Sequence, residues 1–80
     1  MPNLSRQRQH LSLVALGDAL RRRRLERGIS QEELAFRAQV DMSYAGRVER
    51  GDSNVTILTL LKLAHSIELT MKELMDEANL

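Results

Sequence analysis

Hydrophobic residues recur at helical spacing along most of the chain, and no stretch alternates with the two-residue period of a strand. The first apolar stripe predicts a helix over about residues 12–27, with apolar positions at Leu13, Leu16, Leu20 and Leu25. Gly28 follows, where helices commonly end on a residue with left-handed backbone. The polar and basic residues before this helix, 1–11, predict a flexible arm.

A second, shorter helix is expected over residues 31–38. Ser30 and Glu33 have the spacing of a capping box, in which each side chain accepts a hydrogen bond from the backbone N–H of the other residue. The apolar positions of this helix repeat every three to four residues and should face inward: Leu34, Ala35 and Ala38.

A tight turn and a third helix follow directly. Gln39 and Val40 form the turn, and Asp41 is suited to cap a helix over residues 42–49. This helix should end at Arg50-Gly51, because glycine is a common helix terminator.

The C-terminal part of the chain predicts two further helices. Asn54 or Thr56 caps the fourth helix, whose apolar positions are 57, 60, 61, 64 and 67. Thr70 and Glu73 repeat the capping-box spacing and begin a short last helix that carries Leu74. Five helices joined by short turns indicate a compact all-α domain over residues 12–80.

Composition excludes several kinds of protein. A chain of 80 residues makes one domain, and the absence of cysteine excludes a disulfide framework, a thiolate zinc site and a cysteine nucleophile. The longest apolar stretch, 57–64, is interrupted by Thr59 and Lys62 and is far shorter than the roughly 20 residues of a membrane span. The polar N-terminus lacks the apolar segment of a secretory signal. We therefore expect a cytoplasmic protein.

The total charge of +1 hides an uneven distribution. Residues 1–50 hold ten Arg and six acids, a charge of +4, whereas residues 51–80 hold two Lys and five acids, a charge of −3. An arginine-rich half suits phosphate binding, because the guanidinium group matches phosphate oxygens in geometry. The alternative is that the run Arg21–Arg24 is a solvated helix face.

Residues 31–50 have the spacing of a helix-turn-helix, in which a small residue, here Ala35, allows a tight crossing of two short helices. An ordered series extends from Leu16 to Leu74 around this unit: Leu20, Arg24, Gly28–Ala35, Ser43-Tyr44, Arg47–Gly51 and Leu60–Ala64. This series resembles the phage-repressor/Cro class, also called the XRE class. It is most similar to small single-domain members such as restriction–modification controller proteins. The resemblance implies a lambda-repressor-like five-helix DNA-binding domain, bacterial or phage in type and associated with the nucleoid.

The resemblance also implies roles for individual residues. The third helix would lie in the major groove and read bases through Met42, Ser43 and Arg47, of which Arg47 can bind guanine through two hydrogen bonds. Phosphate contacts are implied for Gln31, Tyr44, Arg50, Ser53 and Asn54.

The same resemblance implies a partly buried ion pair between Arg24 and Glu49, which would tie the first helix to the third. Arg21, Arg22, Arg23 and Arg27 then remain for solvent or the DNA backbone.

Three residues depart from the pattern of the class. Gln39 stands in the turn where glycine is usual, so either Gln39 adopts a strained left-handed backbone or the turn has another geometry. Ala45 replaces a larger aliphatic residue. Gly46 weakens the third helix, and it either allows DNA to approach closely or is simply tolerated.

The C-terminal helices carry more apolar surface than one small core needs, at Leu58, Leu61, His65, Ile67, Leu69, Met71 and Met75. Of these we expect Leu58, Leu61, His65, Met71 and Met75 in a dimer interface. A two-fold dimer would place two recognition helices about 34 Å apart, one turn of DNA, and would match a palindromic operator. The alternative is an ordinary core stripe.

Three classes of function can be weighed. The first is a sequence-specific regulator that binds double-stranded DNA as a dimer, without cofactor or small-molecule effector. The second is a protein-interaction module, such as an antitoxin-like subunit with a protein partner. The third, an enzyme, has no support, because the sequence lacks paired carboxylates, a glycine-rich phosphate loop and a Ser/His/Asp set. A metal site is not expected either, since His10 and His65 are the only histidines.

Overall fold

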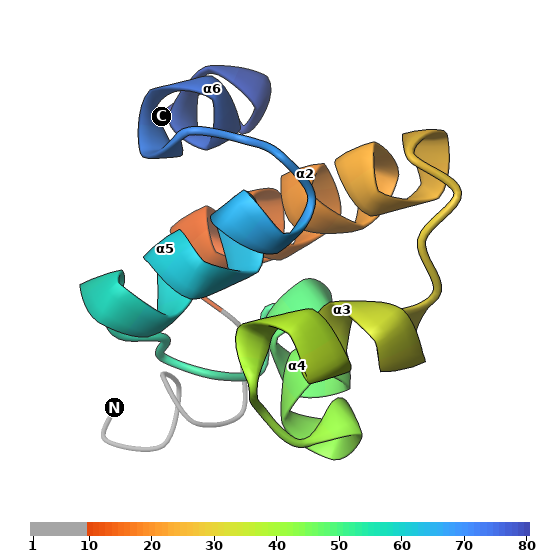
Figure 1. The fold of residues 1–80 in the computed structure, drawn as a ribbon. Coiled ribbons are helices and arrows are strands. Elements are labelled where there is room, and N and C mark those ends of the chain that lie inside the picture. Colours follow the sequence, from red (N-terminus) through yellow and green to blue (C-terminus); the bar gives the residue numbers. More distant parts are fainter. Residues whose placement is uncertain (1–9) are drawn as a thin grey trace.

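The computed structural model describes residues 10–80, which form five helices and contain no strand (Figure 1). The helices are α2 (Leu11–Glu26), α3 (Gln31–Ala38), α4 (Met42–Arg50), α5 (Ile57–Ser66) and α6 (Met71–Glu77). The expected all-α, five-helix fold is therefore confirmed. The expected arm falls mostly in residues 1–9, outside the described residues, and Leu11 already belongs to α2.

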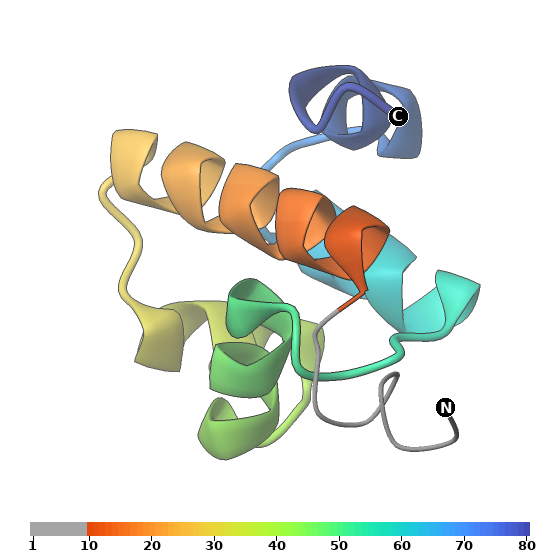
Figure 2. The ribbon, with the colours of Figure 1, turned by 180° about the vertical axis from the view of Figure 1, so that it is seen from behind.

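The helices are arranged around a central pair. Helices α2 and α5 cross the middle of the molecule, α6 lies above them, and α3 and α4 lie below (Figures 1 and 2). Helix α2 packs against both α4 and α6, while α3 packs against α4 and α5. The helix-turn-helix pair is thus held from two sides by the rest of the domain. None of the helices within residues 10–80 is both long and apolar enough to cross a membrane.

One apolar cluster holds these helices together. Its largest fully buried side chains come from four helices and the α5–α6 turn: Leu20, Leu34, Leu63, Ile67, Leu69 and Leu74. Ile67 and Leu69 therefore belong to the core, and the expectation that they add surplus surface is wrong. They flank Glu68, whose left-handed backbone (φ 62°) turns the chain from α5 toward α6.

The buried stripe of α2 differs from the one expected. Leu25 is 52% exposed, whereas Leu20 is fully buried. Five helical residues turn the side chain by about 140° beyond a full turn, so the two leucines point in different directions. Gly17, Leu20 and Arg24 share the inward face instead. The expected stripe is therefore wrong at Leu25, while Arg24 is buried, as the expected ion pair with Glu49 requires.

The two expected capping boxes have different outcomes. Ser30 Oγ accepts from the backbone N–H of Glu33 at 3.0 Å, but the Glu33 carboxylate accepts from Arg37 Nε at 2.8 Å, so only half of that box forms. The box of Thr70 and Glu73 is complete. The Thr70 backbone N–H donates to Glu73 Oε1 at 2.9 Å, and this hydrogen bond lowers the pKa of the Glu73 carboxyl.

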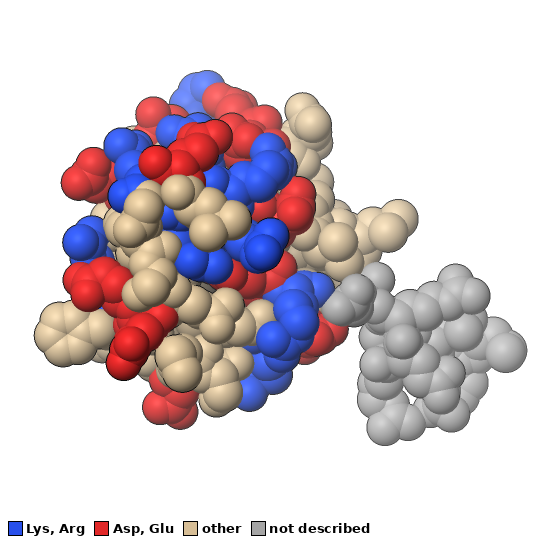
Figure 3. Space-filling model, turned by 90° about the vertical axis from the view of Figure 1, so that its right-hand side faces the viewer, with Lys and Arg blue, Asp and Glu red and all other residues tan. Residues whose placement is uncertain are grey.

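Three of the arginines expected to face solvent or DNA are paired with the C-terminal part of the domain. Arg22 forms an ion pair with Glu77, and Arg23 Nη1 lies 3.2 Å from Glu77 Oε1. Arg27 donates to the main-chain carbonyls of residues 67 and 68. Figure 3 accordingly shows basic and acidic side chains intermixed over α2 and α6 rather than a continuous basic patch. These three side chains stay partly exposed, but each also has a partner on α6 or on the turn before it, so they help to hold the C-terminal part of the domain against α2.

Candidate nucleic-acid interface

The turn between α3 and α4 has the geometry that the class requires. Gln39 adopts left-handed backbone angles (φ 60°, ψ 45°), which settles the two alternatives left open by the sequence. The Val40 N–H donates to the Ala35 carbonyl at 3.0 Å and closes the end of α3. Asp41 occupies the N-cap position of α4, but its side chain makes no capping hydrogen bond, contrary to expectation. A non-glycine residue in the left-handed region costs about 1 kcal/mol, which the surrounding packing offsets.

Helix α4 has one buried side and one exposed side. Ala45, Val48 and Glu49 are buried against the rest of the domain, and Gly46 is buried beneath the side-chain ends of Gln31 and Arg50. The exposed side consists of Met42, Ser43, Arg47 and Arg50. All three residues expected to contact bases therefore lie on the outer side of α4, and no other element within residues 10–80 covers them.

Two glycines allow α4 to lie directly against α2. A Cβ atom on Gly17 would be 2.3 Å from the Val48 carbonyl oxygen, and one on Gly51 would be 2.7 Å from the Val14 Cα. Gly51 also ends α4 with a left-handed backbone (φ 78°). The role of Gly17 was not predicted from the sequence. Its signal was a glycine within a predicted helix, where this residue is unfavourable unless close packing requires it.

A buried hydrogen-bonded cluster joins α2, α3 and α4. Arg24 Nε and Nη2 donate to the two carboxylate oxygens of Glu49 at 2.6 and 3.0 Å, and the side chains are only 8% and 2% exposed. Arg24 Nη1 also donates to the Ile29 carbonyl at 2.9 Å. Gln31 Nε2 donates to Glu49 Oε1 at 3.1 Å. The structure thus brings together the expected ion pair and adds Gln31, the expected phosphate contact, to it.

Arg47 is supported by its neighbour one turn earlier. Its guanidinium carbon lies 5.6 Å from the centre of the Tyr44 ring, within the range of a cation–π interaction. Tyr44 is half-buried and packs against the core, whereas Arg47 is exposed. The ring therefore restricts the arginine to a smaller part of the space in front of α4.

A cavity of about 310 Å³ opens on the outer side of α4. It is lined by Gln31, Met42, Ser43, Gly46, Arg47 and Arg50. The structure therefore gathers three expected base contacts and two expected phosphate contacts around one hollow. Arg50 also lies against Asp52, with Nε 3.2 Å from Oδ2.

The other expected phosphate contacts lie elsewhere. Tyr44 is outside the lining of this cavity, Ser53 is half-buried, and Asn54 is exposed. Asn54 lines a separate cavity of about 370 Å³ together with His10, Ser12 and Leu13. The expected phosphate contact Asn54 therefore lies beside the start of α2, whereas Gln31 and Arg50 lie at the cavity on α4.

The expected dimer residues fall into two groups. Leu58 is 72% exposed, Leu61 is half-buried and His65 is exposed, all on α5. Met71 and Met75 are half-buried and already pack against the core. Ile57, an apolar position of the predicted fourth helix, is 63% exposed at the start of α5. The exposed apolar patch of α5 therefore consists of Ile57, Leu58 and Leu61.

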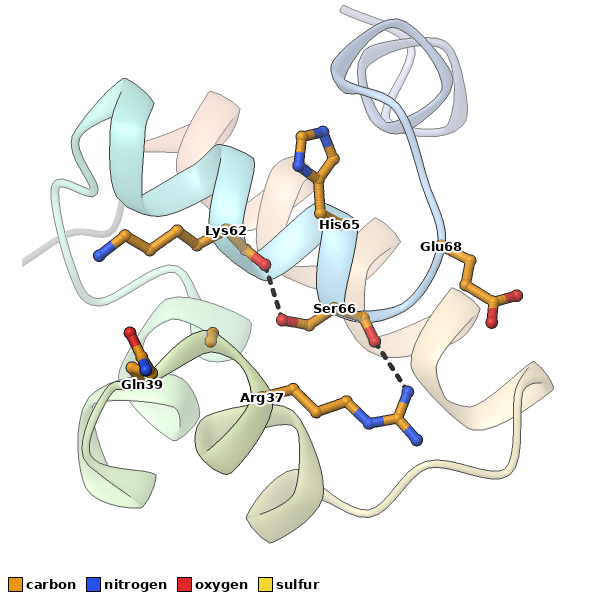
Figure 4. Close-up of a pocket in the computed structure, with 7 residues that line it drawn as sticks. Arg37, Gln39, Lys62, His65, Ser66 and Glu68 are labelled. Atoms are coloured by element: carbon orange, nitrogen blue, oxygen red, sulfur yellow. Dashed lines mark hydrogen bonds between the residues drawn. The ribbon is translucent and has the colours of Figure 1, made fainter.

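A third hollow, of about 560 Å³, lies between the ends of α3 and α5 (Figure 4). Arg37 Nη1 donates to the Ser66 carbonyl at 3.1 Å, which ties α3 to α5. The charged ends of Lys62, Arg37 and Glu68 point in different directions in Figure 4. This hollow therefore offers no converging set of ligands, and its contacts serve to hold the helix-turn-helix on the core. Within residues 10–80 there is also no cluster of His, Cys, Asp or Glu that could hold a metal ion.

Comparison with known proteins agrees with this geometry. The helix-turn-helix family matches residues 20–74. The HTH-type transcriptional regulator y4dJ of Sinorhizobium fredii is 36% identical over 59 residues, which are 74% of this chain and 77% of the relative.

Solved structures of controller proteins are similar as well. The restriction-modification controller protein C.AhdI of Aeromonas hydrophila has a TM-score of 0.78 and 45% identity, over 81% of this chain and 98% of that chain. The C.Esp1396I tetramer, solved in complex with its natural 35-base-pair operator, has a TM-score of 0.75 and 27% identity, over 86% and 96% of the two chains. The chain therefore belongs to the XRE-type helix-turn-helix family, whose members include transcriptional regulators and restriction–modification controller proteins.

Proposed function

We propose that this protein is a non-enzymatic transcriptional regulator that binds double-stranded DNA in a sequence-specific manner, as a homodimer on a palindromic operator. The observation that carries the proposal is the outer side of α4, where Met42, Ser43 and Arg47 project from a helix that is anchored on its other side. A helix presented in this way fits the major groove. The operator complex of C.Esp1396I supports the same mode of binding here.

Each side chain at this surface has a distinct proposed role. Arg47 donates two hydrogen bonds to a guanine, Ser43 donates to or accepts from a base edge, and Met42 contacts a thymine methyl group. Phosphate contacts come from Gln31, Tyr44, Arg50, Ser53 and Asn54. These contacts give affinity that falls as salt rises, because binding releases counterions from the DNA.

Replacing Arg47 with alanine is expected to weaken binding to the selected operator by about 1–3 kcal/mol, roughly 5- to 150-fold. The loss should be larger for the operator than for scrambled DNA, because a base contact is lost. The operator is first selected from a random DNA pool with the wild-type protein, and affinities are then measured by fluorescence anisotropy at two salt concentrations.

Lys72→Ala is the matched control for Arg47→Ala. Lys72 is an exposed cation on α6, on the opposite side of the domain from α4 (Figure 1), and its ammonium group lies 3.0 Å from Asp76 Oδ2. This variant should bind the operator like the wild type. Equal losses for the operator and for scrambled DNA in Arg47→Ala would instead make Arg47 a phosphate contact. A pool without an enriched sequence would contradict specific binding altogether.

Replacing Leu58 with glutamate is expected to convert the dimer to a monomer without unfolding it. The side chain is 72% exposed in the single chain, so the change affects little of the core. In a two-fold interface, however, it places two carboxylates in an apolar contact, which is strongly unfavourable. Sedimentation equilibrium should give a monomer, and affinity for the full palindrome should fall toward that for one half-site.

Leu25→Glu supplies the matched control, since Leu25 is 52% exposed on α2 and the change in charge is the same. It should leave the dimer intact. The second candidate function, an antitoxin-like subunit, is favoured by Phe36, which is 78% exposed on α3 and has no role in the proposed interfaces. A wild-type protein that stays monomeric and binds DNA only with a second protein would favour that candidate.

A further inference from the structure

Helix α4 begins differently from the other four helices of residues 10–80. The N-cap side chains of α2, α3, α5 and α6 each accept a hydrogen bond from a backbone N–H of the first turn. The Asp41 side chain at the N-cap of α4 makes no such bond, although aspartate is among the residues that cap helices best. The Asp41 carboxylate is therefore not used to stabilise its own helix.

This carboxylate also has no partner elsewhere in the part of the chain that the structure describes. Asp41 is exposed, and no hydrogen bond or ion pair within residues 10–80 involves its side chain. The two cations of α4 are directed to other groups, since Arg47 lies over the Tyr44 ring and Arg50 lies against Asp52. A carboxylate at the exposed tip of α4 is thus available to accept a hydrogen bond from a ligand.

Asp41 directly precedes the side chains that we propose to contact bases. Met42 and Ser43 are the next two residues, and both are exposed on the outer side of α4. Arg47 is six residues further on, about 9 Å along the helix axis at 1.5 Å per residue. Because neighbouring base pairs are about 3.4 Å apart, Asp41 and Arg47 face different base pairs. Asp41 therefore adds to this surface a group that only accepts hydrogen bonds.

The chemistry of the major groove decides which base a carboxylate favours. Cytosine presents only the donor of its N4 amino group there, whereas guanine presents two acceptors and thymine presents an acceptor and a methyl group. A carboxylate attracts the first and is repelled by the acceptors of the other two. The same negative charge is unfavourable beside the phosphates of any sequence, so it weakens binding that lacks the favourable base contact.

We propose that Asp41 is a further specificity-determining residue, which accepts a hydrogen bond from the N4 amino group of one cytosine in each half-site of the operator. The inference rests on the proposed function and deepens it, because it assigns a base of the operator to a residue outside the three proposed base contacts. In the competing arrangement, Asp41 turns back to cap α4 when the protein is on DNA. That arrangement predicts no base preference from Asp41.

Asp41→Asn tests the assignment, since asparagine caps helices as well as aspartate does and should keep the fold. Selection from a random DNA pool with the wild type should give an operator with one cytosine in each half-site that the variant no longer requires. The variant should select adenine at that position, because an amide can bind adenine through two hydrogen bonds. Its affinity for scrambled DNA should rise, since a negative charge is lost. Identical selected sequences for the two proteins would overturn the proposal.

Glu32→Gln is the matched control. Glu32 is an exposed carboxylate in the first turn of α3, and the change removes the same charge. This variant should select the same operator as the wild type, which separates a base contact from the general effect of charge. If Glu32→Gln changed the preference at the same base position, that preference would come from charge alone and the proposal would fail.

Modification of the operator tests the atom that is contacted. In N4-methylcytosine the methyl group replaces the amino hydrogen that faces the major groove, while the hydrogen that pairs with guanine remains. This base at the selected position should lower wild-type affinity about tenfold. It should have little effect on Asp41→Gly, which lacks the side chain but retains an acceptable N-cap residue.

Equal losses in the wild type and in Asp41→Gly would show that the methyl group acts through its bulk, and would contradict the proposed hydrogen bond. Failure of the proposed function is distinguishable from failure of this inference. A wild type that selects no operator contradicts the proposed function, whereas an operator shared by the wild type and Asp41→Asn contradicts only the role of Asp41.

Discussion

Replacing Gly17 with alanine is expected to remove much of the stability of the domain. The new Cβ would lie 2.3 Å from the Val48 carbonyl oxygen and 2.5 Å from that of Glu49. Both atoms belong to the backbone of α4, which cannot yield as a side-chain end can, so α2 and α4 must separate. Overpacking of this kind costs about 3 kcal/mol or more. The better helix propensity of alanine offsets only about 0.5–1 kcal/mol of this loss in stability.

Thermal unfolding followed by circular dichroism measures this effect. A domain of this size has a stability of roughly 4–12 kcal/mol, and a net loss of 2–3 kcal/mol lowers its thermal midpoint by about 10–20 °C. Gly46→Ala is the matched control, because it is the same substitution in a helix but meets only movable atoms. Gly17→Ala should lower the midpoint, whereas Gly46→Ala should leave it close to that of the wild type. A Gly17→Ala midpoint within a few degrees of the wild type would show that α2 and α4 can separate at little cost.

The positions of the helices were predictable because their signals are local. The stripe of α3 and the glycines after α2 and α4 involve residues within one or two turns of each other, and the structure has these helices within a residue or two of the expected bounds. Capping was less predictable. Glu33 lies beside Arg37 on the same helix and pairs with it instead of completing its box. Two local interactions competed there, and the sequence alone does not rank them.

Contacts between residues far apart in the sequence were harder to predict. The hydrophobic pattern places Leu25 in the apolar stripe of α2, but only the packed structure shows that Leu25 lies outside the buried face of this helix. The pairing of Arg22 and Arg23 with Glu77 spans more than fifty residues. Charge counting identified an arginine-rich half, yet part of that charge is neutralised by the acidic half and holds α6 in place.

The candidate site was predicted residue by residue from the resemblance, whereas its internal contacts were not. Gln31 and Gly46 are on different helices, and they meet because α3 packs against α4. The resemblance gave Gln31 and Glu49 separate roles, in phosphate binding and in an ion pair. The hydrogen bond between them makes those roles interdependent, so a substitution in the buried ion pair should also lower the affinity for DNA.

Replacing Glu49 with alanine is expected to cost about 3–5 kcal/mol, because it leaves the buried Arg24 guanidinium without its carboxylate partner. Arg24 would retain only its hydrogen bond to the Ile29 carbonyl. The thermal midpoint should fall by roughly 15–30 °C, and urea unfolding should give the corresponding loss of free energy. A loss below 1 kcal/mol would mean that Arg24 reaches solvent once its partner is gone.

The double variant Arg24→Met, Glu49→Leu distinguishes a stranded charge from lost packing. Removing both charges together and filling the space with apolar side chains should restore most of the stability, since the desolvation of the ion pair is avoided. DNA affinity should not return with it, because Gln31 still lacks the carboxylate that orients its amide. A restored double variant that binds the operator as tightly as the wild type would limit the ion pair to a structural role. A double variant as unstable as the sum of the two single changes would contradict the stranded-charge argument, because the loss would then come from packing alone.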